Sequence, residues 1–120
     1  MDKFKSIFLG LEIAYGQYQP GERGDNGKQK GKAFIVRGQV TDELWSNHLA
    51  GKGPALGIIP ITEDNSCRWG CIDIDEYNFD HTSFIKSIRD HKLPLIVCRS
   101  KSGGAHVFLF TKENIPASLM

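Results

Sequence analysis

The sequence predicts an α+β fold in which helices cover one face of a mainly antiparallel sheet. Apolar segments are joined by tight polar turns, at residues 62–66 and 101–104, which favours antiparallel strands. Thr41 and Asp80, whose side chains cap helices well, each precede a segment with helical spacing. The chain has 120 residues, of which 40% are hydrophobic and 24% charged, and this is typical of one ordinary domain. We therefore expect residues 1–120 to form a single domain.

The first third of the chain predicts a helix followed by a loop. Asp2 is a good N-cap, and apolar side chains recur behind it at helical spacing. They are Phe4, Ile7, Phe8 and Leu11. We expect this helix to end near Gly10 or to run on toward Gly16. Residues 16–32, GQYQPGERGDNGKQKGK, show no apolar periodicity and predict a flexible basic loop.

The basic side chains of that loop have two interpretations. They are Arg23, Lys28, Lys30 and Lys32. They either belong to a solvated surface or contact the phosphate backbone of a nucleic acid. The net charge of the whole chain is only +1, so any such contact would have to be local. The nearby rings of Tyr15 and Tyr18 either stack on bases or pack against the first helix.

The middle of the chain predicts a strand, a helix and two further strands. A short strand is expected at 34–36, and a helix begins after Thr41 and stops at the glycines of 51–53. Apolar composition predicts strands at 55–61 and 67–75. The turn composition between these two strands predicts that they form a hairpin.

The last third predicts one helix and two strands. Asp80 caps a helix that runs to about His91. The strands LPLIVCRS, 93–100, and AHVFLF, 105–110, flank the tight KSGG turn. The following tail predicts the start of a further helix, with Pro116 near its first turn.

Asp73 and Asp75 form a carboxylate pair at the end of an apolar strand. Alternation places both side chains on one face of the strand, roughly 6.6 Å apart along the backbone, and Ile72 and Ile74 on the core face. Two adjacent carboxylates repel each other, and a divalent cation removes that cost. Oxygen ligands suit Mg²⁺ or Mn²⁺. The alternative is a pair of acids that simply face solvent at a strand end.

The turn between the last two strands has the composition of a phosphate-binding loop. Its residues are Ser100, Lys101, Ser102, Gly103 and Gly104. Small residues expose backbone N–H groups, and the lysine and hydroxyls add charge and donors. His106 follows at the start of the outgoing strand, where its imidazole is placed to donate to a phosphate oxygen. If this strand neighbours the Asp73 strand, the two features form a site for two-metal nucleotidyl transfer.

The three cysteines, Cys67, Cys71 and Cys98, do not make a metal-binding pattern. A zinc pair of Cys67 and Cys71 with His81 or His91 would lack a second ligand pair at the required spacing, so small buried thiols are the preferred interpretation. The odd count and the lack of a signal-like or membrane-length apolar run favour a reducing, cytoplasmic setting and no membrane partner.

Together, these motifs resemble a known superfamily. CRWGCIDID, followed about thirty residues later by RSKSGGAHVFLF, resembles motifs I and II of the archaeo-eukaryotic primases, or primase-polymerases. The segment NHLAGKGPALGIIPITEDNSCRWGCIDID resembles the branch found in TOTE-type conflict systems and related mobile elements. That branch has a helix ending in H-L-x-G, an apolar strand, an acid-bearing turn, and a Cys-containing strand that leads into D-h-D. The likeness covers roughly residues 44–117.

The resemblance implies a fold, an activity and partners. It implies part of an RRM-like primase core, with residues 1–120 as the N-terminal portion of a longer catalytic domain. The implied activity is that of a DNA primase or polymerase in DNA replication, which transfers nucleotides to a 3′ hydroxyl by a two-metal mechanism. The implied partners are a single-stranded DNA template, nucleoside triphosphates, and a helicase domain or protein.

The resemblance also assigns roles to individual residues. Asp73 and Asp75 match the metal-binding acids, and His106, after Ser102 and Gly103, matches the contact to the incoming triphosphate. Ser100, Lys101 and Gly104 would line the same pocket. His48 matches the H-L-x-G histidine, which is either catalytic or a polar residue near a helix end.

One departure from the superfamily pattern leaves other functions open. Superfamily members carry a third acid on a later strand, whereas after His106 this chain offers only Glu113, in a polar stretch. We therefore do not expect full polymerase activity from these residues alone. The first alternative is a non-catalytic nucleic-acid- or nucleotide-binding module of the same fold. The second is a metal-dependent phosphoesterase or nuclease that uses Asp73 and Asp75.

Overall fold

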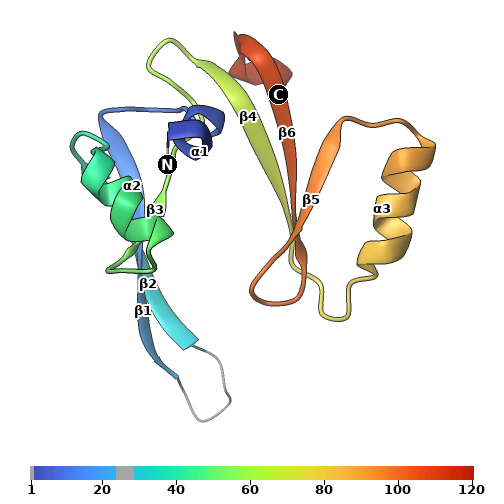
Figure 1. Ribbon diagram of the computed structural model, residues 1–120, viewed down its shortest axis with the longest axis horizontal. Coiled ribbons are helices and arrows are strands. Elements are labelled where there is room, and N and C mark those ends of the chain that lie inside the picture. Colours follow the sequence, from blue (N-terminus) through green and yellow to red (C-terminus); the bar gives the residue numbers. More distant parts are fainter. Residues whose placement is uncertain (1, 24–28) are drawn as a thin grey trace. The chain divides into compact units, whose positions relative to one another are not determined.

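The fold of the chain is an α+β fold with two three-stranded sheets (Figure 1). The computed structural model describes residues 2–23 and 29–120, and the chain divides into two compact units, Met1–Ser66 and Cys67–Met120. Each unit carries its own sheet, apart from Ser66, which begins the first strand of the second sheet. The predicted fold class is confirmed, and the assignment of 1–120 to one domain stays a prediction.

The first unit is built on a sheet with the strand order β2-β1-β3. β1 (Ala14–Arg23) pairs antiparallel with β2 (Gln29–Arg37), and its other edge pairs antiparallel with β3 (Ala55–Gly57). The loop prediction for 16–32 is therefore wrong for its described residues, which lie in strands. Most side chains of this hairpin are exposed, so its residues had no buried face to reveal as apolar alternation.

The two helices of the first unit differ in how well the sequence predicted them. α2 (Asp42–Leu49) begins as expected, with Thr41 Oγ1 accepting a hydrogen bond from the Leu44 amide at 3.3 Å. α1 (Asp2–Ile7) is shorter than the helix predicted to reach Gly10 or Gly16. Beyond it the backbone is no longer helical and lies beside Ile59, whose carbonyl accepts from the Leu11 amide at 2.9 Å.

The core of the first unit is aromatic. Tyr15 and Trp45 are buried, and the Phe4 ring packs edge-on against Trp45 with ring centroids 6.1 Å apart. The burial of Tyr15 favours packing over base stacking for this ring, and its contact with the first helix stays a prediction. Tyr18 is 37% exposed and covers Gly31, where a Cβ atom would fall 2.1 Å from the tyrosine ring.

The second unit is built on a sheet with the strand order β4-β6-β5, and Figure 1 shows β6 between the other two strands. β4 (Ser66–Ile74) leads through α3 (His81–Asp90) to β5 (Leu95–Arg99), and β6 (Ala105–Pro116) returns antiparallel to β5. Thr111 of β6 donates to the Arg68 carbonyl at 3.1 Å. Gly104 meets the end of β4 at Ile74, so β4 and β6 also run antiparallel.

The predicted hairpin of 55–61 and 67–75 is wrong, although its turn is present. Thr62 N–H donates to the Ser66 carbonyl at 2.9 Å, and Asn65 adopts φ 57°, which a tight turn requires. The strands that flank the turn nevertheless pair elsewhere, β3 with β1 and β4 with β6. Turn composition fixes the local bend but not the strand partner.

The helix predicted for the tail is also partly wrong. Residues 111–116 continue β6, and only a short 3₁₀ turn, η1 (Ala117–Leu119), follows Pro116. The Arg68 side chain donates to the Lys112 carbonyl at 2.5 Å, which joins this part of β6 to β4. Sheet pairing therefore outweighs the polar composition of the segment.

The core of the second unit is formed by side chains of β4, β6 and α3. Its buried side chains are those of Cys67, Trp69, Ile88, Ala105 and Val107. The expected core position Ile72 is instead 63% exposed, so that expectation is wrong. In the described ranges, 2–23 and 29–120, no helix is both long and apolar enough to span a membrane.

Candidate functional site

Asp73 and His106 lie side by side on neighbouring strands. Asp73 is near the end of β4 and His106 is near the start of β6, and their Oδ1 and Nε2 atoms are 3.5 Å apart. Their side chains remain 70% and 45% exposed, so a ligand has access to both. Directly across the other edge of β6, Cys98 pairs with His106 in the sheet register. The structure thus brings together the two features that the sequence placed thirty residues apart.

Asp75 follows immediately after β4 and is exposed, like Asp73. Across the described parts of the chain, no group of three or more His, Cys, Asp or Glu side chains is arranged to hold a metal ion. The pair does not therefore form a closed protein cage. Mg²⁺ is often bound by one or two carboxylates, with substrate phosphates and water completing its shell. Asp73 and Asp75 fit that open kind of site.

The Ser100–Gly104 turn lies at the same end of the sheet. Gly103 N–H donates to the Ser100 carbonyl at 3.1 Å, and Ser100 N–H donates to the Gly104 carbonyl at 3.0 Å. These two amides are used within the turn. The hydroxyls of Ser100 and Ser102 lie 3.1 Å apart, and Lys101 is exposed beside them. Two of the turn's amides are therefore engaged in its own bonds, and the hydroxyls of Ser100 and Ser102 are side-chain donors in the same turn.

Each glycine of the turn meets a different structural requirement. Gly103 has φ +96°, a conformation that L side chains rarely adopt. Gly104 is buried, and a Cβ atom on it would lie 1.9 Å from the Ile74 carbonyl oxygen at the end of β4. The turn can thus approach the carboxylate strand only because position 104 has no side chain.

His81, which the sequence analysis did not place in the site, contacts this turn. It is the first residue of α3, and its Nε2 lies 2.8 Å from the Gly104 carbonyl oxygen. Its position just after the Asp80 cap was visible in the sequence, but its contact across the fold was not. No local pattern signals a bond between residues 23 positions apart.

The cysteines differ from the buried thiols expected. Cys67 is buried, whereas Cys71 and Cys98 are exposed, so the expectation holds for Cys67 alone. Desolvation and, after it, the neighbouring Asp73 carboxylate raise the pKa of the Cys71 thiol above its ordinary value of 9.0. This thiol therefore stays protonated at neutral pH, which disfavours it as a nucleophile or metal ligand.

Glu113 does not complete the carboxylate pair. It lies seven positions beyond His106, and the polar stretch around it continues β6. Seven residues of strand span about 23 Å at 3.3 Å per residue. Glu113 is thus too far along the strand to share a cation with Asp73.

His48 has a structural contact at the end of α2. Its Nδ1 accepts a hydrogen bond from the Leu56 amide of β3 at 3.2 Å. Because Nδ1 is the acceptor, the neutral ring carries its proton on Nε2. This bond joins helix to strand within the first unit and favours the structural interpretation of the histidine.

Two of the four predicted basic residues form a mixed surface with an aromatic ring. Lys30, Lys32 and Phe34 alternate along β2, so they share one face of the hairpin. Gln19 and Gln17, opposite Lys32 and Phe34 in the register, lie on that same face. Both lysines are exposed, and Phe34 is 44% exposed. We call Lys30, Lys32, Phe34, Gln17 and Gln19 the basic hairpin face. Arg23 ends β1, and Lys28 lies outside the described residues.

The opposite face of the hairpin has a different character. It carries a shallow apolar hollow of about 450 Å³. Ile35 and Tyr18 flank a floor made by Gly16 and Gly57, which face each other across β1 and β3. One face of the hairpin is therefore basic and polar with one exposed ring, and the other is apolar.

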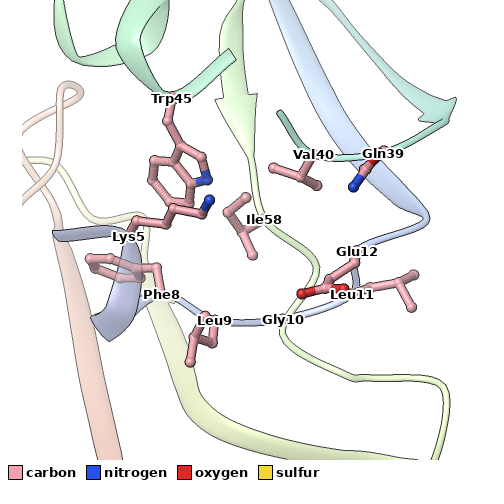
Figure 2. A pocket seen from close by; sticks show the side chains of 10 residues that line it. All are labelled: Lys5, Phe8, Leu9, Gly10, Leu11, Glu12, Gln39, Val40, Trp45 and Ile58. Carbon is pink, nitrogen blue, oxygen red and sulfur yellow. The ribbon is translucent and has the colours of Figure 1, made fainter. Parts of the chain in front are cut away.

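A smaller cavity of about 140 Å³ lies in the first unit, and Figure 2 shows the side chains around it. Trp45, Phe8 and Ile58 supply apolar walls, and Lys5 and Glu12 supply charge. Lys5 is paired with Asp42, whose hydrogen bond raises the pKa of the lysine. Ligand pockets usually measure about 300–1,000 Å³, so this space is too small for a nucleotide. None of the predicted site residues lines it.

A comparison with protein families assigns the chain. The family described as "TOTE conflict system, Archaeo-Eukaryotic Primase domain" matches residues 17–120, which include most of the first unit, the whole second unit and both Asp73 and His106. No curated protein matches the chain. Primase-family nucleotidyltransferases are typically dependent on divalent metal, and a primase-type domain interacts with nucleic acid and nucleoside triphosphates. The superfamily and branch suggested by the motifs are confirmed. The chain belongs to the archaeo-eukaryotic primase domain family of TOTE conflict systems.

Proposed function

We propose that this chain supplies the nucleotide- and metal-binding part of a primase-polymerase site, which transfers nucleotides to a 3′ hydroxyl on a single-stranded DNA template. The observation that carries the proposal is the placement of Asp73 beside His106, with Oδ1 and Nε2 3.5 Å apart, at the end of the sheet where the Ser100–Gly104 turn lies. Carboxylates, an imidazole and a hydroxyl-rich turn are the groups that hold a triphosphate and its cation.

His106 is proposed to contact the triphosphate of the incoming nucleotide. At 3.5 Å its Nε2 is too far from Asp73 for a strong hydrogen bond, so turning to a phosphate oxygen breaks no such bond. The Phe108 ring lies edge-on to the imidazole, with centroids 6.2 Å apart, and limits how far the imidazole can swing.

The turn is proposed to bind the remaining phosphate oxygens. The hydroxyls of Ser100 and Ser102 donate hydrogen bonds, and Lys101 neutralises charge from its exposed position. Gly103 and Gly104 allow the backbone to pass close to β4, so these donors remain near the carboxylates. Asp73 and Asp75 would hold Mg²⁺ or Mn²⁺, which in this chemistry neutralises the triphosphate and lowers the pKa of the 3′ hydroxyl.

The template strand is proposed to lie on the basic hairpin face. Lys30 and Lys32 neutralise phosphates without reading sequence, and the exposed Phe34 ring offers a surface on which a base can stack. Gln17 and Gln19 add donors and acceptors beside them. Arg23 and Lys28 stay sequence-based predictions, since the Arg23 side chain and the whole of Lys28 lie outside the described part of the structure.

A second candidate function is a non-catalytic nucleotide- or nucleic-acid-binding module of the same fold. It is favoured by one observation: within the described residues no third metal-ligating side chain joins Asp73 and Asp75. Two carboxylates are sufficient to bind a cation together with phosphates, but a two-metal reaction is usually supported by more.

Primer synthesis on single-stranded DNA with Mn²⁺ and nucleoside triphosphates, assayed in a protein that carries this chain within a longer catalytic domain, separates these functions. Asp73→Ala and Asp75→Ala should abolish the product, whereas Asp90→Ala, which removes a charge from the exposed end of α3, should not. Primer synthesis that is unchanged in either site variant would overturn the proposal. Strand binding without Mn²⁺-dependent nucleotide binding would favour the non-catalytic module. Release of mononucleotides without added triphosphate would indicate a nuclease.

A further inference from the structure

His81 joins the start of α3 to the candidate phosphate-binding turn. Its Nε2 lies 2.8 Å from the Gly104 carbonyl oxygen, which can only accept a hydrogen bond. Nε2 must therefore carry the proton in this contact. The side chain is half-buried, and its donor is directed at backbone and not at solvent.

The carbonyl that His81 holds is the one that closes the turn. The Gly104 carbonyl oxygen also accepts a hydrogen bond from the Ser100 amide at 3.0 Å. One oxygen therefore accepts from Ser100, at the start of the turn, and from His81, at the start of α3. Loss of the imidazole would leave the Ser100 amide as the one donor that the structure describes for this oxygen. The turn would lose its tie to α3, and the Ser100 bond would open more often.

The tie bears directly on the site because Gly104 is held between two elements. On one side a Cβ atom at this position would lie 1.9 Å from Ile74 O, the carbonyl that precedes Asp75. On the other side stands His81. Two residues further along β6, His106 faces Asp73. A shift at Gly104 would therefore change the distance from the turn hydroxyls to the carboxylates.

The neighbours of His81 fix the direction of its ring. Phe79 meets the imidazole edge-on, with centroids 4.9 Å apart, and Phe79 also packs against Phe84 of α3. Asp80 caps the helix by accepting from the Ser83 amide at 3.0 Å and from its hydroxyl at 2.7 Å. The start of α3 is thus a formed structure from which a donor can position a loop.

We propose that His81 is a positioning residue, whose Nε2–H holds the Gly104 carbonyl and so keeps the Ser100–Gly104 turn placed to receive phosphates beside Asp73. That the ligand is a nucleoside triphosphate rests on the proposed function. The hold on the turn rests only on the contacts of His81, Gly104 and Ser100.

Three variants test the proposal by titration of the chain with a nucleoside triphosphate and Mn²⁺. His81→Leu removes the donor and retains similar bulk, and it should weaken binding about three- to tenfold, the range for one lost hydrogen bond. His81→Gln places an amide N–H where Nε2 stood and should restore affinity to within about twofold. His91→Leu is the matched control, since it removes an imidazole that contacts the Ser87 carbonyl at 2.8 Å at the other end of α3. It should leave binding unchanged.

A merely structural role for His81 gives a different pattern. In that case His81→Leu and His91→Leu would lower the melting temperature alike and both leave affinity at the parent value. Nucleotide affinity in His81→Leu equal to that of the parent overturns the positioning role and leaves the proposed function intact.

A measurement without nucleotide tests the role of His81 even if the proposed function is wrong. If the parent binds no nucleotide, amide hydrogen exchange at Ser100 is measured on the free chain. Faster exchange in His81→Leu, reversed in His81→Gln, keeps His81 as the residue that positions the turn. Equal exchange in the parent and His81→Leu overturns it.

Discussion

Gly104 lies where the Ser100–Gly104 turn meets the end of β4. A side chain there would have to displace the Ile74 carbonyl, because even a Cβ atom would fall 1.9 Å from that oxygen. The backbone of a strand end cannot move aside as a flexible side chain does. The distance between the turn and Asp73 therefore depends on the absence of one methyl group.

Gly104→Ala is accordingly expected to destabilise the chain by about 1–3 kcal/mol, the cost of overpacking. Gly38→Ala is the control, since a Cβ atom at Gly38 meets nothing within 4 Å, and it should change stability by less than about 0.5 kcal/mol. Urea unfolding followed by circular dichroism measures both. Equal stabilities of the two variants would contradict the close approach of turn and strand.

At the residue scale, some of the site could be predicted from sequence and some could not. Asp73, Asp75 and His106 are distinguished by residue type and spacing, because carboxylates two apart and a histidine after glycines are chemically informative on their own. His81 carries no such mark. Its role depends on where α3 starts relative to the turn, and this is set by tertiary packing.

At the scale of elements, the caps of the two longer helices respond differently to pH. Asp80 accepts from the amide and hydroxyl of Ser83, and these bonds hold its pKa below the ordinary value of 3.8. A carboxyl whose pKa is lower when folded stabilises the fold above pH 3.8, and this contribution is lost as the pH falls through the folded pKa. Thr41, which caps α2, has no charge to lose.

Asp80→Ala should therefore lower the melting temperature clearly at pH 7, and the gap to the parent should narrow as the pH falls below 3.8. Thr41→Ala should cost about 1 kcal/mol at either pH, because its cap is a hydroxyl. Thermal unfolding of both variants at pH 7 and pH 3 measures the difference. A gap for Asp80→Ala that stays constant with pH would show that its carboxylate does not act as a charged cap.

The β1–β2 hairpin makes a second prediction at this scale. Phe34→Ala should weaken binding of single-stranded DNA by about 1–3 kcal/mol, the value of one stacked base. Ile35→Ala is the matched control, because Ile35 is 64% exposed on the opposite face of the same strand. Fluorescence anisotropy with a labelled oligonucleotide measures the affinities. Weaker binding in Ile35→Ala and unchanged binding in Phe34→Ala would contradict this placement and would indicate that the DNA binds the apolar face of the hairpin.

The elements show why sequence patterns succeeded in one half of the fold and failed in another. α3 was predicted with its cap and its end because one of its faces is buried and the other is not. Residues 16–32 did not predict strands because glycine and lysine are frequent among them and the side chains described there are mostly exposed. The partner of β4 was also mistaken, since pairing with β6 joins residues more than thirty positions apart.

At the scale of the whole molecule, both units contribute recognisable parts of one family domain. The family match runs from residue 17 to residue 120, so it covers the β1–β2 hairpin apart from its first three residues. The site residues Asp73 and His106 and the turn all belong to the second unit, and the basic hairpin face belongs to the first. The proposed nucleotide binding and the proposed DNA-strand binding are therefore separable by mutation, and each variant reports on one unit.

The central claim is that Asp73 and His106 act on one nucleotide. A double-mutant cycle tests it, with nucleoside triphosphate affinity measured by calorimetry in Mn²⁺ for the parent, Asp73→Asn, His106→Gln and the double variant. Two side chains that share one ligand should be coupled, so the double variant should lose less than the sum of the single losses. The account predicts Mn²⁺-dependent binding that each single variant weakens at least tenfold, with such coupling. Full affinity in both single variants, or losses that simply add, would contradict it.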